Sequence, residues 1–159
     1  MRRAAILIVC SIPVLLGGCL SANAPRQPPP QAAPQPSADT PGVIVNAPSA
    51  TVRQVIADNA RARGAKIAAN EPRGIVLEGE LKSSPPLLEE ACGKHVPGRK
   101  QRIVLETQET PQGTFLSDRR FIVDGDNVCP LKLTPSEFSE ATKRLNATKQ
   151  AAEQKVAQR

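Results

Sequence analysis

Two cysteines and the only histidine are the residues of this chain whose types and spacing could do chemistry. Cys92 and His95 are separated by two residues, and Cys129 follows later. The three side chains could bind zinc, or a thiolate beside the imidazole could act as a nucleophile. A structural zinc site usually has four protein ligands, however, and no fourth ligand stands out. The two cysteines could instead form a disulfide, which would leave His95 as a surface loop residue.

Positive charge is concentrated in the segment that follows Cys92. It comes from Lys94, His95, Arg99, Lys100 and Arg102. Such a cluster could contact phospholipid headgroups, lipopolysaccharide phosphates or an acidic patch on a partner protein. More often such a cluster is only a solvated loop. We therefore treat four of these residues as candidate contacts to a partner or a phosphate: Lys94, Arg99, Lys100 and Arg102.

Two acidic patterns are explained by local structure rather than by chemistry. Asp124, Asp126 and Asn127 could suggest calcium, but the later ligands and the closing glutamate of a calcium loop are missing. We predict a polar hairpin turn there instead. Glu89 and Glu90 occupy adjacent helical positions, which do not face each other, so they cannot form an acid–base dyad. No cofactor or metal is expected, and the chain is predicted not to be an enzyme.

The N-terminus carries the most informative motif. Arg2 and Arg3 precede an apolar stretch that is shorter than the roughly 20 residues needed to cross a bilayer as a helix. The stretch ends in Leu16-Gly17-Gly18-Cys19. This arrangement resembles the signal peptide and lipobox of bacterial lipoproteins. The resemblance implies cleavage before Cys19 and acylation of its sulfur, which would hold the chain at a membrane. An ordinary secretory peptide with an incidental cysteine is the alternative.

The same resemblance predicts where the protein resides. In lipoproteins of this kind an aspartate directly after the acylated cysteine favours retention at the inner membrane, and here that residue is Leu20. We therefore expect a lipid anchor in the outer membrane, with the rest of the chain facing the periplasm. No nucleic-acid partner is expected, because the chain has no Trp, no Tyr and only 3 Phe to stack on bases.

The lipoprotein resemblance also reduces the alternatives for the cysteines. Cys10 would be removed with the signal peptide, and Cys19 would carry the lipid. Cys92 and Cys129 would remain as a pair in an oxidising compartment, where disulfides form and persist. We therefore predict a Cys92–Cys129 disulfide.

Composition divides the chain into four parts. A run rich in proline, alanine and glutamine cannot bury enough apolar surface to fold, so we interpret it as an extended spacer rather than a proline-motif ligand. The predicted parts are a signal peptide (1–18), a lipidated N-terminus with a proline-rich linker (19–48), an α+β domain (42–133) and a C-terminal helix (134–159).

Turn and capping signals predict the elements of the folded part. Thr51 and Gln54 match a capping box at a helix start, and Gly64 is typical of a helix end. Thr134 and Glu137 form a second capping box, before a helix with a thin apolar stripe that is expected to pack lightly or fray. Strands are expected over 43–45, 66–69, 75–81, 102–109 and 114–123, with a short helical turn over 87–92.

Hairpin-type connections between these strands predict an antiparallel sheet with a helix packed on one face, an α+β fold. The order of Val52–Ile56, Arg63–Ile67 and Gly74–Glu78 resembles small helix-plus-sheet domains of outer-membrane barrel-assembly lipoproteins. We therefore expect a non-catalytic accessory or scaffold subunit with an envelope protein partner. The alternative is a carrier that holds a small apolar or lipid ligand in a groove between the first helix and the sheet.

Overall fold

The computed structural model describes residues 39–158. The predicted signal peptide, the acylation site at Cys19 and most of the proline-rich linker lie outside the described residues. Within the described part, no helix is long and apolar enough to cross a membrane.

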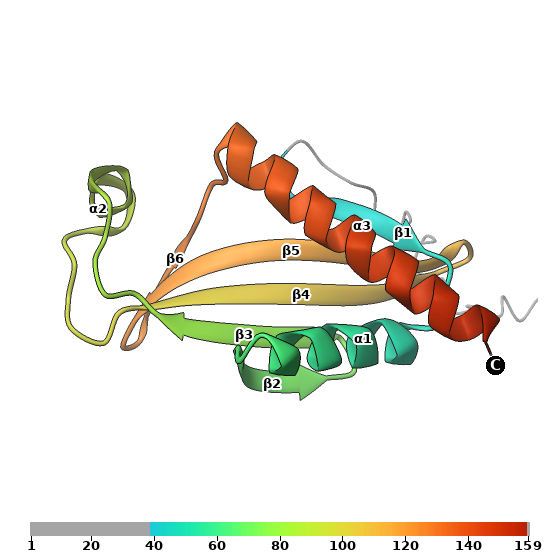
Figure 1. Cartoon of the computed structure of the whole chain (residues 1–159). Helices are drawn as coiled ribbons and strands as arrows, with labels where there is room; N and C mark the ends of the chain where they lie inside the picture. Colours follow the sequence, from blue (N-terminus) through green and yellow to red (C-terminus); the bar gives the residue numbers. More distant parts are fainter. Residues whose placement is uncertain (1–38, 159) are drawn as a thin grey trace, which may run out of the picture. The chain divides into compact units, whose positions relative to one another are not determined.

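A single antiparallel sheet of six strands forms the centre of the described domain (Figure 1). The strands follow the order β1-β5-β4-β3-β2, and β6 pairs with β5 beyond the end of β1. They are β1 (Gly42–Val45), β2 (Lys66–Glu71), β3 (Gly74–Glu80), β4 (Lys100–Thr110), β5 (Gly113–Asp124) and β6 (Asn127–Pro130). The α+β class is confirmed. The sixth strand was not predicted, because its four residues are too short for an alternating pattern to be recognised.

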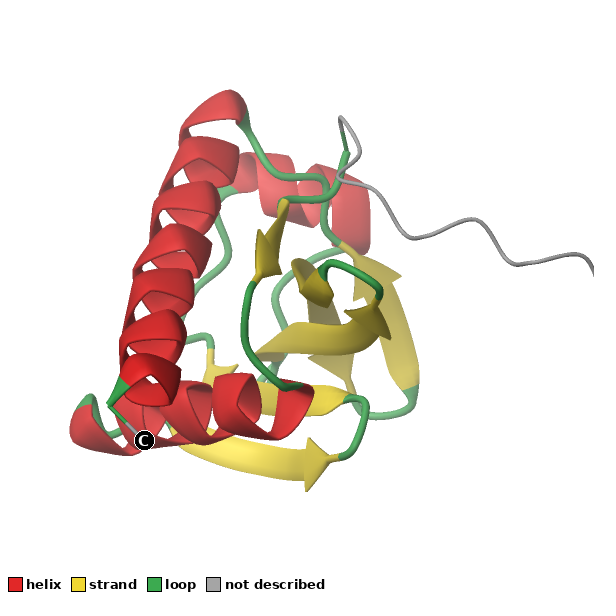
Figure 2. Cartoon of the chain, turned by 90° about the vertical axis from the view of Figure 1, so that its right-hand side faces the viewer, coloured by secondary structure: helices red, strands yellow, loops and turns green. Residues whose placement is uncertain are grey.

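Two of the three described helices cover one face of this sheet. They are α1 (Ser49–Ala62) and α3 (Pro135–Ala157), and α2 (Pro86–Cys92) lies beyond one end of the strands (Figure 1). Figure 2, turned by 90°, shows α3 along one side of the strands and α1 running crosswise to it at the lower edge. The core beneath them contains Val52 and Ile56 of α1, Ile75 of β3, and Leu116 of β5.

The C-terminal helix packs more firmly than its sequence suggested. Ala141, Leu145 and Ala152 are at most 2% exposed, and the last two belong to the main core cluster. The expectation of light packing is therefore wrong. Small alanine side chains bury little area individually, but they allow the α3 backbone to approach α1 and β1 closely, and this depends on the tertiary arrangement.

The two predicted capping boxes have different outcomes. The box at Thr134 and Glu137 is present, with both reciprocal hydrogen bonds formed. The one at Thr51 is not: α1 begins at Ser49 after Pro48, and Thr51 lies inside the first turn, buried at 5% exposure. Pro48 has a fixed φ of −59° and a carbonyl that accepts the backbone N–H of Thr51, so the helix starts earlier.

Candidate functional site

An apolar groove lies between the two helices that cover the sheet. α1 and α3 come together near the C-terminus of the chain and diverge toward the other end, leaving part of β4 between them in the view of Figure 1. The groove has a volume of about 250 Å³. Its floor is formed by Leu77, Ile103, Leu105 and Leu116. Its walls include Ile56, Asn59 and Ala60 of α1, Arg63 just after α1, and Arg144, Leu145, Ala147 and Thr148 of α3.

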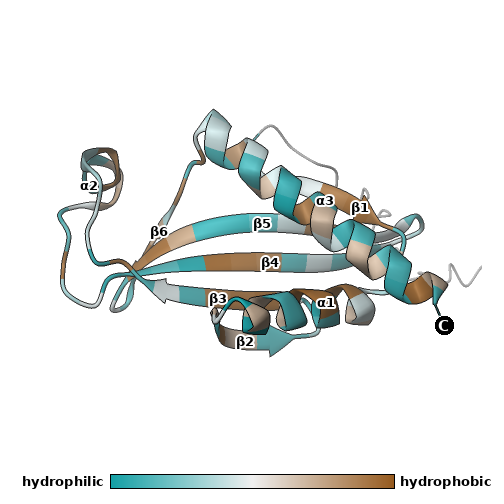
Figure 3. Ribbon diagram, in the orientation of Figure 1, coloured by the Kyte–Doolittle hydropathy of each residue, from teal (hydrophilic) through white to brown (hydrophobic). Residues whose placement is uncertain are grey.

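The floor of the groove is hydrophobic and offers no backbone hydrogen bonds. Figure 3 colours a stretch of β4 as hydrophobic, and Ile103 and Leu105 of this strand line the groove. Ile103 pairs with Leu77 of β3 on one side and with Arg120 of β5 on the other, and Leu105 is likewise paired on both sides. The main-chain groups of these floor residues are therefore used within the sheet.

A buried ion pair borders the groove on β5. The Asp118 carboxylate accepts hydrogen bonds from Nε and Nη2 of Arg120 at 3.2 and 3.1 Å, and the two side chains are only 5% and 9% exposed. Asp118 also lines a second, more polar hollow of about 360 Å³ near β6 and the start of α3. Because both oxygens of Asp118 are bonded to Arg120, the carboxylate adds little net negative charge to the apolar groove.

Two arginines on opposite walls give the groove its charge. Arg63 follows the last residue of α1, and its guanidinium makes no side-chain hydrogen bond or ion pair among the described residues. Arg144 on α3 has only a long contact to Glu140, at 3.6 Å between two side chains that are about 60% exposed. Such exposed pairs are weak, so Arg144 remains available to an anion.

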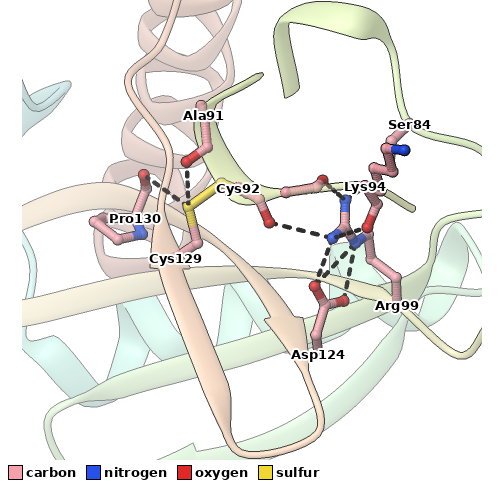
Figure 4. The surroundings of a disulfide bond; sticks show 9 residues. Ser84, Ala91, Cys92, Lys94, Arg99, Asp124, Cys129 and Pro130 are labelled. Carbon is pink, nitrogen blue, oxygen red and sulfur yellow. Dashed lines mark hydrogen bonds and ion pairs between the residues drawn. A yellow bond between two sulfur atoms is a disulfide. The ribbon is translucent and has the colours of Figure 1, made fainter. Parts of the chain in front are cut away.

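Arg99 does not have the role that its sequence position suggested. Its side chain is 1% exposed, and its guanidinium donates to Asp124, to Ser84 Oγ and to the carbonyls of Cys92, Gly93 and Lys94 (Figure 4). The shortest of these bonds, from Nη2 to Asp124 Oδ2, is 2.6 Å. Hydrogen bonds with Asp124 also raise the pKa of Arg99. The prediction that Arg99 contacts an external partner or phosphate is therefore wrong.

The other residues of the predicted positive cluster are dispersed. Arg102 and Lys100 both contact the carboxylate of Glu78 on β3, at 2.6 and 3.6 Å. The hydrogen bond from Arg102 holds the pKa of Glu78 below its ordinary value. Lys94 is exposed, and its backbone carbonyl binds Arg99. The structure thus does not bring the four predicted contact residues together as one free cationic patch, because three of them are held in carboxylate pairs within the domain.

The predicted disulfide is confirmed. Cys92 at the end of α2 and Cys129 in β6 are bridged, with their Cα atoms 5.8 Å apart. The bridge occupies both sulfurs, which removes the ligands of the alternative zinc site and the thiolate of the alternative nucleophile. His95 is half-buried instead of lying free on the surface: its Nδ1 is 3.1 Å from Ser84 Oγ, and its backbone N–H donates to Glu89. No group of three potential metal ligands occurs among residues 39–158.

The pairing of Asp124 and the α3 wall of the groove were missed by reasoning from the sequence. Asp124 was interpreted as part of a polar turn, whereas its carboxylate is the partner of a buried arginine 25 residues away in the chain. The groove is formed by residues from five elements, each of which was predicted separately, but α3 was not expected to form one of its walls. The one available signal was the pair of arginines, Arg63 and Arg144, placed beside apolar helical positions.

Comparisons with known proteins add no further assignment. Neither a protein-family model nor a curated protein matches this chain. Functional inference therefore depends on the motifs and the geometry described above.

Proposed function

We propose that this protein is an envelope lipoprotein, anchored through an acylated Cys19, whose α+β domain serves as a non-catalytic accessory or scaffold module in the periplasm. The lipobox Leu16–Cys19 supports the anchor. The Cys92–Cys129 disulfide is the structural observation that carries the proposal, because such bridges persist in oxidising compartments outside the cytosol. Outer-membrane placement rests on Leu20, as the lipoprotein resemblance implies.

A non-catalytic role agrees with how the reactive side chains are used. Both cysteines outside the N-terminal region are joined to each other, and Arg99 and Asp124 bind each other. A module of this kind acts by binding. The outer edge of β2 pairs with no strand within residues 39–158, so it offers unpaired main-chain groups to a partner strand.

Substitution of the acylated residue tests the anchor. The Cys19→Ala chain should move from the membrane fraction to the soluble periplasmic fraction or accumulate with its signal peptide uncleaved, and its intact mass should lack acyl groups. Cys10→Ala is the matched control and should leave the mature mass and the membrane location unchanged. A Cys19→Ala chain that is still processed, acylated and membrane-bound would contradict the proposal.

Photocrosslinking from the edge strand tests the scaffold role. A photoreactive residue at Ala68, which is exposed on β2, should yield one discrete protein adduct in intact cells. The same group at Gln150, exposed on α3, should not yield that adduct. Equal labelling from both positions would show that β2 has no specific partner.

The groove between α1 and α3 favours a second candidate function, a carrier of a small apolar or lipid ligand. It lies between helix and sheet, where the carrier hypothesis expected it, although α3 supplies one wall in addition to α1. Native mass spectrometry of the protein released gently from cells should then detect a bound small molecule. A ligand-free spectrum, combined with no uptake of any alkyl compound, would eliminate the carrier function.

A further inference from the structure

The groove has features that select for an alkyl chain over a peptide. An extended peptide needs partners for its N–H and C=O groups, and the floor around Ile103 and Leu105 has none to give. A saturated hydrocarbon chain makes no such demand and gains from leaving water. The groove volume of about 250 Å³ is slightly below that of sites enclosing a whole drug-sized ligand, so it suits one chain with its headgroup outside.

The walls of the groove select the charge of that headgroup. Arg63 at the end of α1 and Arg144 on α3 line it, and the carboxylate among the described lining residues, Asp118, is already paired with Arg120. A cationic headgroup would meet two like charges here. An anionic headgroup would meet two guanidinium groups, which bind carboxylates and phosphates well.

We propose that the groove binds an anionic amphiphile with a single alkyl chain, the chain lying on Ile103 and Leu105 and the headgroup between Arg63 and Arg144. This inference rests on the carrier function proposed above and names its ligand class. A fatty acid and a lysophospholipid with an anionic headgroup share this chemistry, and the experiment distinguishes them.

Binding is measured by calorimetry on the exported chain bearing Cys19→Ser, so that its own acyl groups cannot enter the groove. The probes are dodecanoate and dodecyltrimethylammonium, which have alkyl chains of the same length and opposite headgroup charge, both kept below their micellar concentrations. Dodecanoate should bind about tenfold more tightly, as expected for two partly exposed arginines that each contribute about threefold. Lysophosphatidylglycerol is then compared with dodecanoate, and the tighter of the two identifies the source of the ligand.

Three pairs of variants locate the binding site. Ala147→Trp fills the groove from an exposed position on α3, and it should abolish binding, whereas Asn146→Trp at the next exposed position does not line the groove and should not. Arg63→Gln should weaken dodecanoate binding about threefold, whereas Arg61→Gln on the same helix should leave it unchanged. Arg144→Gln is compared with Lys143→Gln in the same way.

Each outcome has a separate meaning. Equal affinity for the two probes, both lost in Ala147→Trp, would overturn the anionic class while leaving an apolar carrier in place. Binding that survives Ala147→Trp, or no binding of either probe, would overturn the groove site itself. A photoreactive residue at Ala147 that labels a protein in cells instead of a lipid would assign the groove to a partner and also refute the proposal. None of these results bears on the Cys19 anchor, which has its own test.

Discussion

Removing the Cys92–Cys129 bridge should destabilise the domain without changing its fold. The cysteines are 37 residues apart, and closing a loop of that length lowers the entropy of the unfolded chain by about 13 cal/mol/K. This corresponds to about 4 kcal/mol at 25 °C. A domain of this size has a total stability of about 5–15 kcal/mol, so the bridge provides a large fraction of it.

The native loop should stay in place after the bridge is removed, because a second set of contacts holds it. Arg99 binds the carbonyls of Cys92, Gly93 and Lys94 and also binds Asp124 of the β5 end, so the loop is attached to the sheet independently of sulfur. The decrease in the free energy of unfolding should therefore arise mainly from the unfolded chain, which becomes less compact without the bridge. The denaturant m-value should increase accordingly.

Equilibrium denaturation of the Cys92→Ala/Cys129→Ala variant measures this effect, and wild type kept in dithiothreitol provides the same change with the original side chains. Circular dichroism of both should match that of the oxidised protein before unfolding. Arg99→Met with the bridge intact is the complementary variant, and it should make residues 81–99 sensitive to protease in the native state. A loss below about 1 kcal/mol, or a loop that becomes protease-sensitive on reduction alone, would refute the entropic reasoning.

Three further predictions concern packing, hydrogen bonding and pH. Leu145→Ala should lower the free energy of unfolding by about 2–5 kcal/mol because Leu145 is 2% exposed in the core, whereas Val156→Ala, at 38% exposure, should lower it far less. Equal losses for the two variants in equilibrium denaturation would contradict the packing of α3. Thr107→Val should stabilise the domain by about 1 kcal/mol, because the buried Thr107 hydroxyl has no hydrogen-bond partner among the described residues. Thr114→Val should instead destabilise it by about 1 kcal/mol or more, because the Thr114 hydroxyl donates to the carbonyl of Ala47 at 2.6 Å. Hydrogen bonds from Thr134 at the start of α3 hold the pKa of Glu137 below its ordinary 4.5. The stability that ionised Glu137 gives the folded domain is therefore fully present above pH 4.5 and is lost as the pH falls through the lower folded-state pKa. The stability of Glu137→Gln should accordingly fall less at acidic pH than that of the wild type, as measured by the fluorescence of a dye that binds the unfolded chain after a pH jump. An equal loss of stability in acid for the two proteins would contradict the prediction.

Residues whose signals are local were interpretable from the sequence. Alternating apolar residues predicted β3, β4 and β5, and Gly64 marked the end of α1 with its φ of +67°. The Thr134 capping box works through atoms three residues apart, so its outcome did not depend on the rest of the fold. The disulfide was predicted from the count of cysteines together with the resemblance of residues 1–19 to a lipoprotein signal peptide.

The tertiary structure decided what those residues can contact. Arg99 belongs to a basic cluster in the sequence, but folding places it against Asp124, and a guanidinium with its donors satisfied cannot serve an external phosphate. The thin stripe of α3 became a core element because α1 and β1 supply the complementary surface. The groove likewise exists only because two helices distant in the chain diverge over β4, and no local pattern records the angle between them. The sequence by itself determined most strands through short-range rules and indicated the disulfide through its cysteines, whereas burial and site geometry depend on contacts between distant segments.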